Sequence, residues 1–347
     1  MTNISPESCR SLLLWMQEKV KKVVLVTHAN PDGDALGSTL GLHSVLLNAG
    51  FQSAVVYPTD FPPLVPGLEN YANWVIFDNS EKQACRILDE ADLLFFLDFN
   101  DIKRTGRVRK KLEALSTKVV LIDHHPQPIV ETPFLFSDTK VSSTAELAFD
   151  FIVKMGWLQH LDKLAANALL TGIIADTASF SHNAGRPELY DATARLIAKG
   201  ADQHSIQEAL FNTNSADRLR LLGFALSEKM RIFPEYHAAL ISLTKEELKK
   251  FNFKVGDTEG FVNYPLSVKG IIFSAFFLEN EEKIKISFRS KGGFAANDFS
   301  ALHFGGGGHH NAAGGESRKS LQEAVDNWIS LLPQYSDSLE KESRAER

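Results

Sequence analysis

The sequence predicts an α/β protein of two domains, and three observations support this. The chain has 347 residues, 44% of them hydrophobic, which is enough for one large core or two smaller ones. In the first half, continuous apolar β-type runs alternate with helical patterns, which is typical of a parallel sheet with helices on both faces. In the second half the pattern changes to β-rich runs with a hairpin spacing, which indicates a smaller α/β domain.

Apolar runs in the first half predict the strands of the parallel sheet, at Val23–Thr27, Ser53–Tyr57, Leu93–Leu97 and Val119–Ile122. Helices are expected between and after them, at Leu36–Asn48, Leu147–Met155 and Leu161–Ala175. Ser143 and Glu146 have the spacing of a capping box that opens the second of these helices. Residues 1–22 lack a basic region ahead of an apolar stretch, so we expect an amphipathic helix rather than a signal peptide.

The second half is predicted to begin with a joining helix at Asn214–Met230. Strands are expected at His237–Leu243, Gly270–Leu278 and Lys283–Phe288, the last two forming a hairpin around residues 280–282. A capping box at Thr244 and Glu247 opens a short helix, and further helices are expected at Asn297–Phe304 and Ser320–Leu332. The predicted organisation is a catalytic domain (1–213), a helical linker (214–231), a second domain (232–334) and a charged tail that frays (335–347).

Composition limits the partners of the chain. There are 37 basic and 43 acidic side chains, a net charge of -6, which argues against long duplex nucleic acid and favours a small anionic substrate. The two cysteines, Cys9 and Cys85, form no CxxC pair and fit a reducing cytoplasm. No run approaches the ~18 apolar residues of a membrane span, so no membrane partner is expected. Whether the chain forms a homodimer stays open.

Ligand-type side chains follow the apolar segments of the first half. They are His28, Asp32 and Asp34 after the first strand, Asp98 and Asp101 after the third, Asp123, His124 and His125 after the fourth, and Asp176 at a helix end. In an open parallel sheet, ligands bind beyond the carboxyl ends of the strands. We therefore expect these side chains to converge at one edge of the sheet.

Crowded carboxylates repel each other at neutral pH, and cations remove that repulsion. Carboxylate and imidazole ligands without thiolates suit Mn²⁺, Mg²⁺ or Fe²⁺, and Zn²⁺ is an alternative ion for such a ligand set. Five or six ligands exceed the need of one open catalytic ion, and a bridging carboxylate would make a two-metal site. Gly33 is expected to permit a tight backbone between Asp32 and Asp34. One such aspartate alone is more often a helix cap or turn residue, but turn chemistry accounts poorly for four clusters together.

The second half carries a pattern of its own. Arg289 and Ser290 end a predicted strand, and Gly305–Gly308 precede His309 and His310. Consecutive glycines let backbone N–H groups approach an anion, and His309 and Arg289 would add positive donors. The alternative is that the glycines form a flexible loop or allow close packing.

These residues together resemble the DHH phosphoesterase superfamily, in the branch with an added DHHA1 domain. The matching segments are HANPDGDALGS, LDFND, IDHH, GIIADT and, in the second half, GGGGHHNAAGG. The compact two-domain form is similar to the nano-RNase and phosphoadenosine-phosphate phosphatase group, without the membrane and sensor segments of cyclic-dinucleotide phosphodiesterases.

The resemblance implies two divalent ions, most simply Mn²⁺. It implies that His28 and Asp32 hold one ion, that Asp34, His124 and Asp176 hold the other, and that Asp98 bridges them. Asp123 would orient the site, and His125 would contact the substrate phosphate. The substrate's other phosphate would be bound by residues of the second domain, namely Arg289, Ser290, Gly306, Gly307, Gly308 and His309. Arg104 is counted with the substrate-binding residues, and Asn100, Asp101 and His310 receive no role.

The resulting prediction is a Mn²⁺-dependent enzyme that hydrolyses short oligoribonucleotides to mononucleotides and removes the 3′-phosphate of 3′-phosphoadenosine 5′-phosphate. The same chemistry on polyphosphate, a cyclic or linear dinucleotide, or single-stranded DNA is the nearest alternative. A non-catalytic nucleotide sensor is an alternative of another class, and the intact ligand set argues against it.

Overall fold

The computed structural model describes residues 5–345, which divide into two compact units, one up to Thr213 and one from Asn214 onwards. The predicted N-terminal helix is present as α1 (Pro6–Lys19), while residues 1–4 of that prediction lie outside the described part. The predicted joining helix appears as α9 (Ala216–Phe224) with one π-helical turn (Ala225–Lys229). It belongs to the second unit, because Leu221 is buried in that unit's core.

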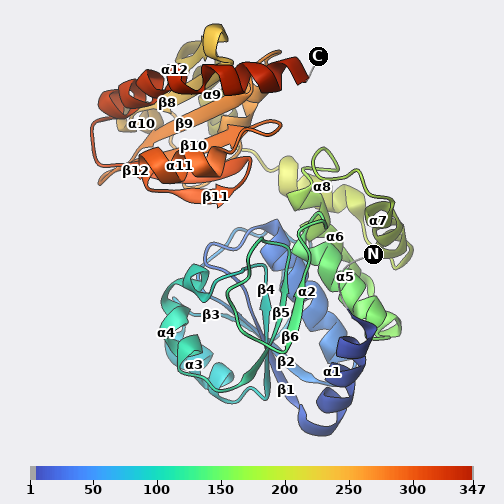
Figure 1. The fold of residues 1–347 in the computed structure, drawn as a ribbon. Coiled ribbons are helices and arrows are strands. Elements are labelled where there is room, and N and C mark those ends of the chain that lie inside the picture. The colour runs from blue at the N-terminus through green and yellow to red at the C-terminus, as the bar shows by residue number, and fades with distance from the viewer. Residues whose placement is uncertain (1–4, 346–347) are drawn as a thin grey trace. The chain divides into compact units, whose positions relative to one another are not determined.

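The first unit is built on a six-stranded parallel sheet in the order β3-β2-β1-β4-β5-β6 (Figure 1). The strands are β1 (Lys22–Val26), β2 (Gln52–Tyr57), β3 (Trp74–Ile76), β4 (Leu93–Leu97), β5 (Lys118–Asp123) and β6 (Phe134–Ser137). The predicted parallel sheet and its four strands are confirmed. Sequence reasoning missed β3 and β6, which lie at the two edges of the sheet and are only three and four residues long.

Helices cover both faces of this sheet (Figure 1). One face carries α1, α2 (Gly33–Asn48), α5 (Thr144–Lys154) and α6 (Lys163–Asp176). The other face carries α3 (Glu81–Asp89) and α4 (Arg109–Glu113). Two further helices, α7 (Pro187–Ala198) and α8 (Gln203–Phe211), pack beside α6. Short 3-10 segments lie at Leu68–Asn70, Ile102–Val108 and Leu158–His160.

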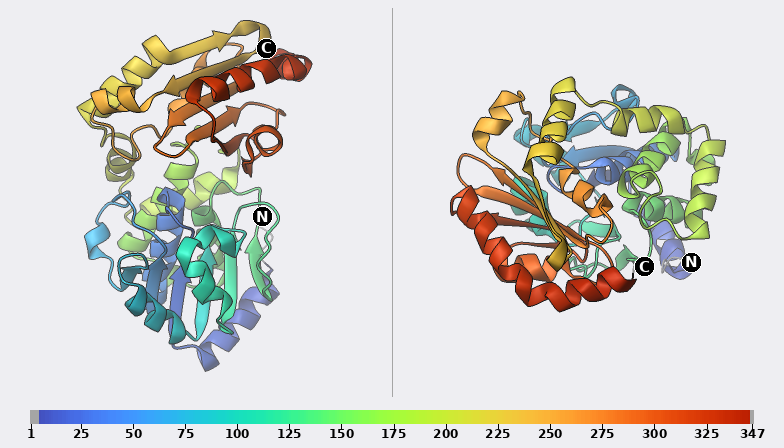
Figure 2. Two further views of the ribbon diagram at one scale, coloured as in Figure 1. Left: turned by 90° about the vertical axis from the view of Figure 1, so that its left-hand side faces the viewer. Right: turned by 90° about the horizontal axis from the view of Figure 1, so that it is seen from above.

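The second unit has a mixed sheet in the order β11-β12-β10-β9-β8-β7. Its strands are β7 (Met230–Phe233), β8 (Ala238–Leu243), β9 (Phe273–Glu279), β10 (Ile284–Ser290), β11 (Gly307–His309) and β12 (Ala312–Ser317). One face packs on α11 (Ala296–Phe304) and α12 (Leu321–Ala345), and Figure 2 shows α12 lying across that face. The other face packs on α9, α10 (Lys245–Lys250) and the 3-10 segment Phe261–Ser267. The predicted β9–β10 hairpin and the Thr244 capping box are confirmed.

The C-terminal segment differs from the prediction. We expected a helix that ends at Leu332 and a frayed charged tail after it, but α12 continues to Ala345 through Pro333. A proline removes one N–H donor, and buried contacts beyond it can still hold a helix together. Leu339 supplies such a contact, since it is fully buried in the core of this unit. Glu342 also accepts a hydrogen bond from the backbone N–H of Gly293 at 2.7 Å.

The glycines of α2 allow it to lie very close to α6. A Cβ on Gly37 would lie 2.4 Å from the carbonyl oxygen of Ala168 and 2.6 Å from the backbone nitrogen of Gly172. A Cβ on Gly33 would lie 2.4 Å from the Cβ of Ala175. Gly33 is the first residue of α2 and its φ lies outside the left-handed region, so the backbone between Asp32 and Asp34 does not itself need a glycine. Its lack of a side chain serves helix packing.

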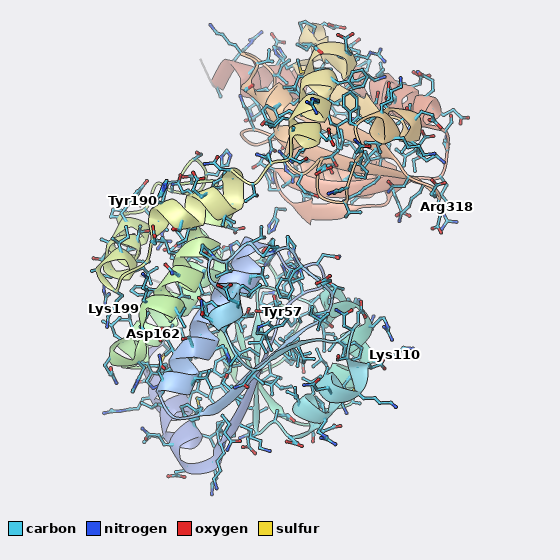
Figure 3. The ribbon with its side chains drawn as sticks, turned by 180° about the vertical axis from the view of Figure 1, so that it is seen from behind. Tyr57, Lys110, Asp162, Tyr190, Lys199 and Arg318 are labelled. Carbon is cyan, nitrogen blue, oxygen red and sulfur yellow. The ribbon has the colours of Figure 1, made fainter. Side chains whose placement is uncertain are left out.

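Two of the residues labelled in Figure 3, Tyr57 and Asp162, make polar contacts with α2. The hydroxyl of Tyr57, at the end of β2, lies 3.0 Å from the Thr39 hydroxyl in the middle of α2. Asp162 caps α6 by accepting from the N–H of Ala165, and its other oxygen accepts from the Asn48 amide at the end of α2. The two helices are therefore tied together at one end by Asp162.

The start of α5 is capped differently from the prediction. Ser143 accepts from the N–H of Glu146, as expected. The Glu146 carboxylate does not return to Ser143; it accepts from the N–H and the hydroxyl of Ser142 and from Arg186 at 2.7 Å. A partly buried ion pair between Arg186 and Glu146 therefore holds the N-terminal end of this helix.

Cys9 is buried, Cys85 is partly exposed, and neither forms a disulfide. Across residues 5–345, the helices are all too short or too polar to cross a membrane.

Candidate metal centre

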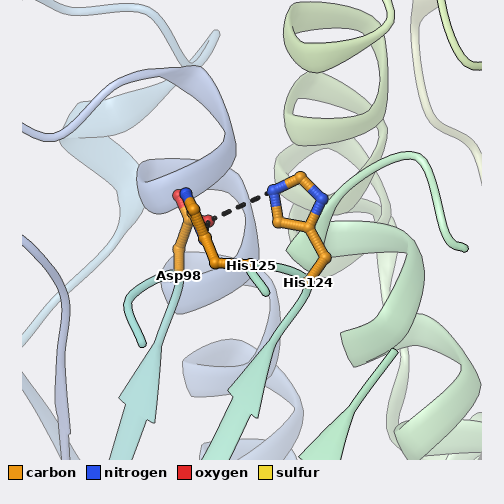
Figure 4. Close-up of side chains that lie close together, drawn as sticks. All are labelled: Asp98, His124 and His125. Atoms are coloured by element: carbon orange, nitrogen blue, oxygen red, sulfur yellow. Dashed lines mark ion pairs between the residues drawn. The ribbon is translucent and has the colours of Figure 1, made fainter. Parts of the chain in front are cut away.

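The ligand-type residues meet at the carboxyl ends of the central strands. From β1 the sheet continues to β2 on one side, and from β4 it continues to β5 on the other. The gap between β1 and β4 is therefore a topological switch point, where open α/β sheets bind ligands. His28 follows β1, and Asp98 follows β4. Figure 4 shows Asp98 beside His124 and His125, which follow the neighbouring strand β5.

A first group of three ligand atoms comes from His28, Asp32 and Asp98, all within 4.8 Å of one another. The Nε2 atom of His28 lies 3.3 Å from Asp98 Oδ2 and 4.0 Å from Asp32 Oδ1. Asp32 is the N-cap of α2, and its Oδ1 accepts the N–H groups of Asp34 and Ala35. The group is thus assembled from two strand ends and one helix start.

A second group of three comes from Asp34, His124 and Asp176, again within 4.8 Å. His124 Nε2 lies 3.4 Å from Asp176 Oδ2 and 4.0 Å from Asp34 Oδ2. Asp34 lies in the first turn of α2, and Asp176 is the last residue of α6. The close approach of these two helices is therefore what brings the two carboxylates together.

Asp98 lies between the two groups. Its Oδ2 faces His28, and its Oδ1 lies 3.7 Å from His124 Nε2 and 3.7 Å from His125 Nδ1. Its backbone has φ 66°, a left-handed conformation that costs free energy in residues other than glycine and that often occurs at functional sites. Aspartate and asparagine tolerate it best among residues with side chains.

Thr144, the first residue of α5, contacts both groups. Its backbone N–H donates to Asp34 Oδ2 at 2.6 Å, and its hydroxyl donates to Asp98 Oδ1 at 2.9 Å. The N–H of Ala145 donates to the other Asp34 oxygen at 2.8 Å. Sequence reasoning missed Thr144, because the segment showed only a helix start and no ligand-type pattern.

The residues present fit a metal centre. His28 Nδ1 lies 2.9 Å from the Ala29 carbonyl, so Nδ1–H donates to it and Nε2 faces Asp98 Oδ2 at 3.3 Å. That Nε2 is buried and makes no hydrogen bond within the described residues. Burial alone would lower the pKa of His28, but the carboxylate of Asp98 raises it, so this position favours a cation at Nε2, either a proton or a metal ion. Carboxylate and imidazole donors without thiolates suit Mn²⁺, Mg²⁺ or Fe²⁺.

The pKa values of the carboxylates indicate how unfavourable it is to keep all of them charged without a cation. Burial, followed by the negative charge of Asp98, raises the pKa of Asp34 and of Asp176 well above the ordinary value. Burial alone would also raise the pKa of Asp98, but the imidazoles of His28 and His124 hold it below its ordinary range. The site therefore keeps one carboxylate charged and opposes the charging of two others.

Metal-free protein is expected to lose stability as the pH rises. A proton held by Asp34 and Asp176 in the folded state contributes stability that is fully present below the ordinary carboxyl pKa and is lost as the pH rises through their raised pKa. The contribution of Asp98 is constant over this range, because its folded pKa lies lower still. Burial lowers the pKa of His43 and His124, so these two groups stabilise the fold as the pH rises to about 7 and contribute no further change above it. Thermal unfolding of chelator-treated protein from about pH 7 to about pH 9 should therefore show a falling midpoint, which Mn²⁺ restores. A midpoint that stays constant or rises without metal would contradict this.

Beside the two groups, His125 is held by hydrogen bonds at both ring nitrogens. Its Nδ1 lies 2.7 Å from Oδ1 of the fully buried Asp123, and its Nε2 lies 2.9 Å from Arg104 Nη1. Arginine can only donate, so Nε2 accepts and Nδ1–H donates to Asp123. Asp123 thus orients His125, and Arg104 brings a permanent positive charge to this edge of the sheet.

The two polar residues after β4 that had no predicted role are structural. Asn100 donates its amide to the Pro126 carbonyl at 2.8 Å, which ties this loop to the one after β5. Asp101 accepts from the N–H of Lys103 and caps the 3-10 segment that carries Arg104. Both residues therefore hold the loops that present the site.

In the second unit, strand register places Arg289 and His309 in one row. Arg289 of β10 and His309 of β11 each pair with Ala312 of β12, so the three side chains lie on the same face of the sheet. Their neighbours Phe288 and Ala313 face the core under α11 and α12, so this row lies on the opposite face. Arg289 also lines a small pocket with Lys285, Ser287 and Glu259. Ser290 lies apart from this row, since its hydroxyl donates to the Phe294 carbonyl and accepts from Asn311.

The glycine cluster leads into an ordered hairpin of β11 and β12, and two of its four glycines, Gly306 and Gly308, serve close packing. A Cβ on Gly306 would lie 1.8 Å from the Gly314 carbonyl oxygen. A Cβ on Gly308, where φ is 149°, would lie 2.4 Å from the Ala312 carbonyl oxygen. Gly307 alone of the three predicted binding glycines has open space around it. His310 is exposed in the turn, without an assigned role.

Comparison with known proteins identifies the class. Residues 22–173 match the model of the DHH family N-terminal domain, and residues 237–335 match the DHHA1 domain. A bifunctional oligoribonuclease and PAP phosphatase, NrnA of Thermus thermophilus, is 30% identical over 84% of this chain and 83% of its own. The cyclic-di-AMP phosphodiesterase PdeA of Listeria monocytogenes is 29% identical over 90% of this chain. The matched region covers 48% of the length of PdeA.

A crystal structure of an exopolyphosphatase-related protein from Bacteroides fragilis is 38% identical, with a TM-score of 0.93 over 98% of this chain and 99% of that one. The fold, the cluster of carboxylates and imidazoles, and these relatives define the chain as a phosphoesterase, a hydrolase of phosphate esters. The chain belongs to the DHH family, with a DHHA1 domain in its second unit.

Proposed function

We propose that the chain hydrolyses short oligoribonucleotides to mononucleotides with two divalent ions, in the first instance Mn²⁺, and that it also removes the 3′-phosphate of 3′-phosphoadenosine 5′-phosphate. The observation that carries the two-ion proposal is the placement of Asp98, with one oxygen toward each group of ligands. The substrate proposal rests on the likeness to the Thermus thermophilus protein, whose name states both activities.

In this proposal His28 and Asp32 hold one ion, Asp34, His124 and Asp176 hold the other, and Asp98 is shared. Two ions at such a site lower the pKa of a bound water and draw charge from the phosphoryl oxygens. Asp32 is mostly exposed and Asp176 partly exposed, whereas Asp34 and Asp98 are buried. The substrate therefore reaches the site from the side of Asp32 and Asp176.

The remaining side chains of this edge bind the phosphate that is cleaved. Arg104 supplies a charged donor, and His125 is kept in one orientation by Asp123. Charged hydrogen bonds to phosphate oxygens are stronger than neutral ones. Arg104 has N–H donors for the phosphate beyond the one that His125 accepts, and His125 would contact the phosphate when Arg104 releases its Nε2, while Asp123 acts through His125.

A second phosphate is assigned to the row of Arg289 and His309 in the second unit. Burial lowers the pKa of Arg289, but guanidinium groups stay charged in proteins. The small side chain of Ala312 between the two donors leaves room above it, and Gly307 is the one glycine of the hairpin with open space. Ser290 is proposed to shape this region through Phe294 and Asn311.

A substrate panel tests the proposal. Purified protein with Mn²⁺ is offered a labelled ribo-trimer, 3′-phosphoadenosine 5′-phosphate, cyclic-di-AMP and polyphosphate in parallel. Conversion of the trimer to mononucleotides, abolished by a chelator, is the expected result. The names of the Listeria and Bacteroides relatives make cyclic-di-AMP and polyphosphate the competing substrates. An inert trimer with rapid cleavage of either competitor would overturn the substrate proposal, and tight binding without turnover on any substrate would favour a sensor.

A further inference from the structure

We infer that Thr144 is a positioning residue of the metal centre, which aims the carboxylate of Asp98 at both groups of ligands. The inference rests on the proposed two-ion function. Thr144 is fully buried and touches a carboxylate of each group, Asp34 through its backbone and Asp98 through its hydroxyl. Thr144 is not proposed as a metal ligand, because its N–H and its hydroxyl donate hydrogen bonds to the carboxylates that are.

The hydroxyl contact determines which way Asp98 faces. A carboxylate can only accept, so the hydroxyl proton of Thr144 points to Asp98 Oδ1. Each carboxylate oxygen has two lone pairs, so Oδ1 keeps one for a cation on the side of His124. The other oxygen, Oδ2, is thereby turned toward His28. Without the hydroxyl, the carboxylate plane of Asp98 could rotate away from the orientation that serves both groups.

The backbone contact fixes Asp34 in the same way. The N–H groups of Thr144 and Ala145 each bind one Asp34 oxygen, at the start of α5, where unpaired N–H groups favour an anion. The start of α5 is itself anchored, because Glu146 binds Ser142 and Arg186. The position of Thr144 is therefore determined from outside the metal centre.

Other buried threonines show that this contact is not the ordinary behaviour of the residue. The hydroxyls of Thr39, Thr105, Thr171, Thr177 and Thr193 each donate to a carbonyl three or four residues earlier in their own segment. Such bonds satisfy the hydroxyl locally. The hydroxyl of Thr144 instead binds the carboxylate of Asp98, 46 residues away in the sequence.

The test measures Mn²⁺ affinity by calorimetry in chelator-stripped wild type, Thr144→Val, Thr144→Ser and Thr193→Val. Valine keeps the branched shape and the backbone N–H but removes the hydroxyl. Thr193 is a matched control, since its buried hydroxyl donates to the Leu189 carbonyl of its own helix. Partners that orient metal ligands typically change affinity by about 10- to 100-fold, so we expect a loss of about tenfold or more for Thr144→Val. Thr144→Ser and Thr193→Val should stay within about threefold of wild type.

Equal Mn²⁺ affinity in wild type and Thr144→Val would overturn the inference, and so would an equal loss in Thr193→Val. Absence of Mn²⁺ binding in the wild type itself would instead overturn the proposed function and, with it, the role of Thr144. If Thr144→Val does not fold, Thr144→Ala carries the same expectation, because it removes the hydroxyl without adding a methyl group in its place. Retained affinity in a folded Thr144→Ala would then contradict the inference.

Discussion

Asp98→Asn is expected to lower kcat/KM for the ribo-trimer by about a thousandfold or more, which corresponds to about 4 kcal/mol. The amide removes the negative charge that lies between the two groups of ligands, at 3.3 Å from His28 and 3.7 Å from His124. Asparagine tolerates the left-handed backbone of this position, so the substitution tests the charge rather than the fold. Initial rates at saturating Mn²⁺, with circular dichroism as a check on folding, measure the effect.

Asp162→Asn is the matched control for this substitution. Asp162 caps the opposite end of α6 from Asp176, and its carboxylate contacts Ala165 and Asn48 rather than the metal centre. Asparagine is also a good N-cap, so this variant should keep its activity. Wild-type activity and metal content in Asp98→Asn would show that the two-ion mechanism is wrong.

Gly37→Ala is expected to lower the free energy of unfolding by about 1–3 kcal/mol or more, the usual cost of forcing an extra carbon into a packed contact. The added Cβ would lie 2.4 Å from a backbone oxygen and 2.6 Å from a backbone nitrogen of α6, so one helix has to shift. A shift of α6 would also separate Asp176 from Asp34. We therefore expect weaker Mn²⁺ binding together with the lost stability, measured by urea denaturation and calorimetry.

Gly223→Ala is the control for a glycine inside a helix. Gly223 lies in α9, and a Cβ there would meet nothing within 4 Å. Alanine favours the helix over glycine, so this variant should be as stable as wild type or slightly more stable. Equal stability of Gly37→Ala and wild type would mean that α2 and α6 do not require the close contact.

The features that sequence reasoning predicted well are local ones. A strand such as Leu93–Leu97 is a continuous apolar run, and its ligand-type residue, Asp98, follows directly. The convergence of such residues then follows from a general property of parallel sheets. The likeness of the motifs to the DHH family supplied the assignment of ligands to ions, which the strand pattern alone left open.

The features that it missed depend on contacts between distant residues. Thr144 meets Asp98 only because α5 packs at the end of the sheet, and nothing around Thr144 in the sequence indicates this contact. The packing role of Gly33 was missed for the same reason, since its neighbour is Ala175. The extension of α12 depends on the burial of Leu339 in the second core, which outweighs the local signals of Pro333 and a charged composition.

The most direct test of the central claim is a crystal structure of the Mn²⁺-loaded protein, with anomalous diffraction measured at the manganese absorption edge. Two anomalous peaks are predicted, one beside His28 and Asp32 and one beside Asp34, His124 and Asp176, with Asp98 between them. A single peak, or Mn²⁺ bound away from Asp98, would contradict the two-ion centre.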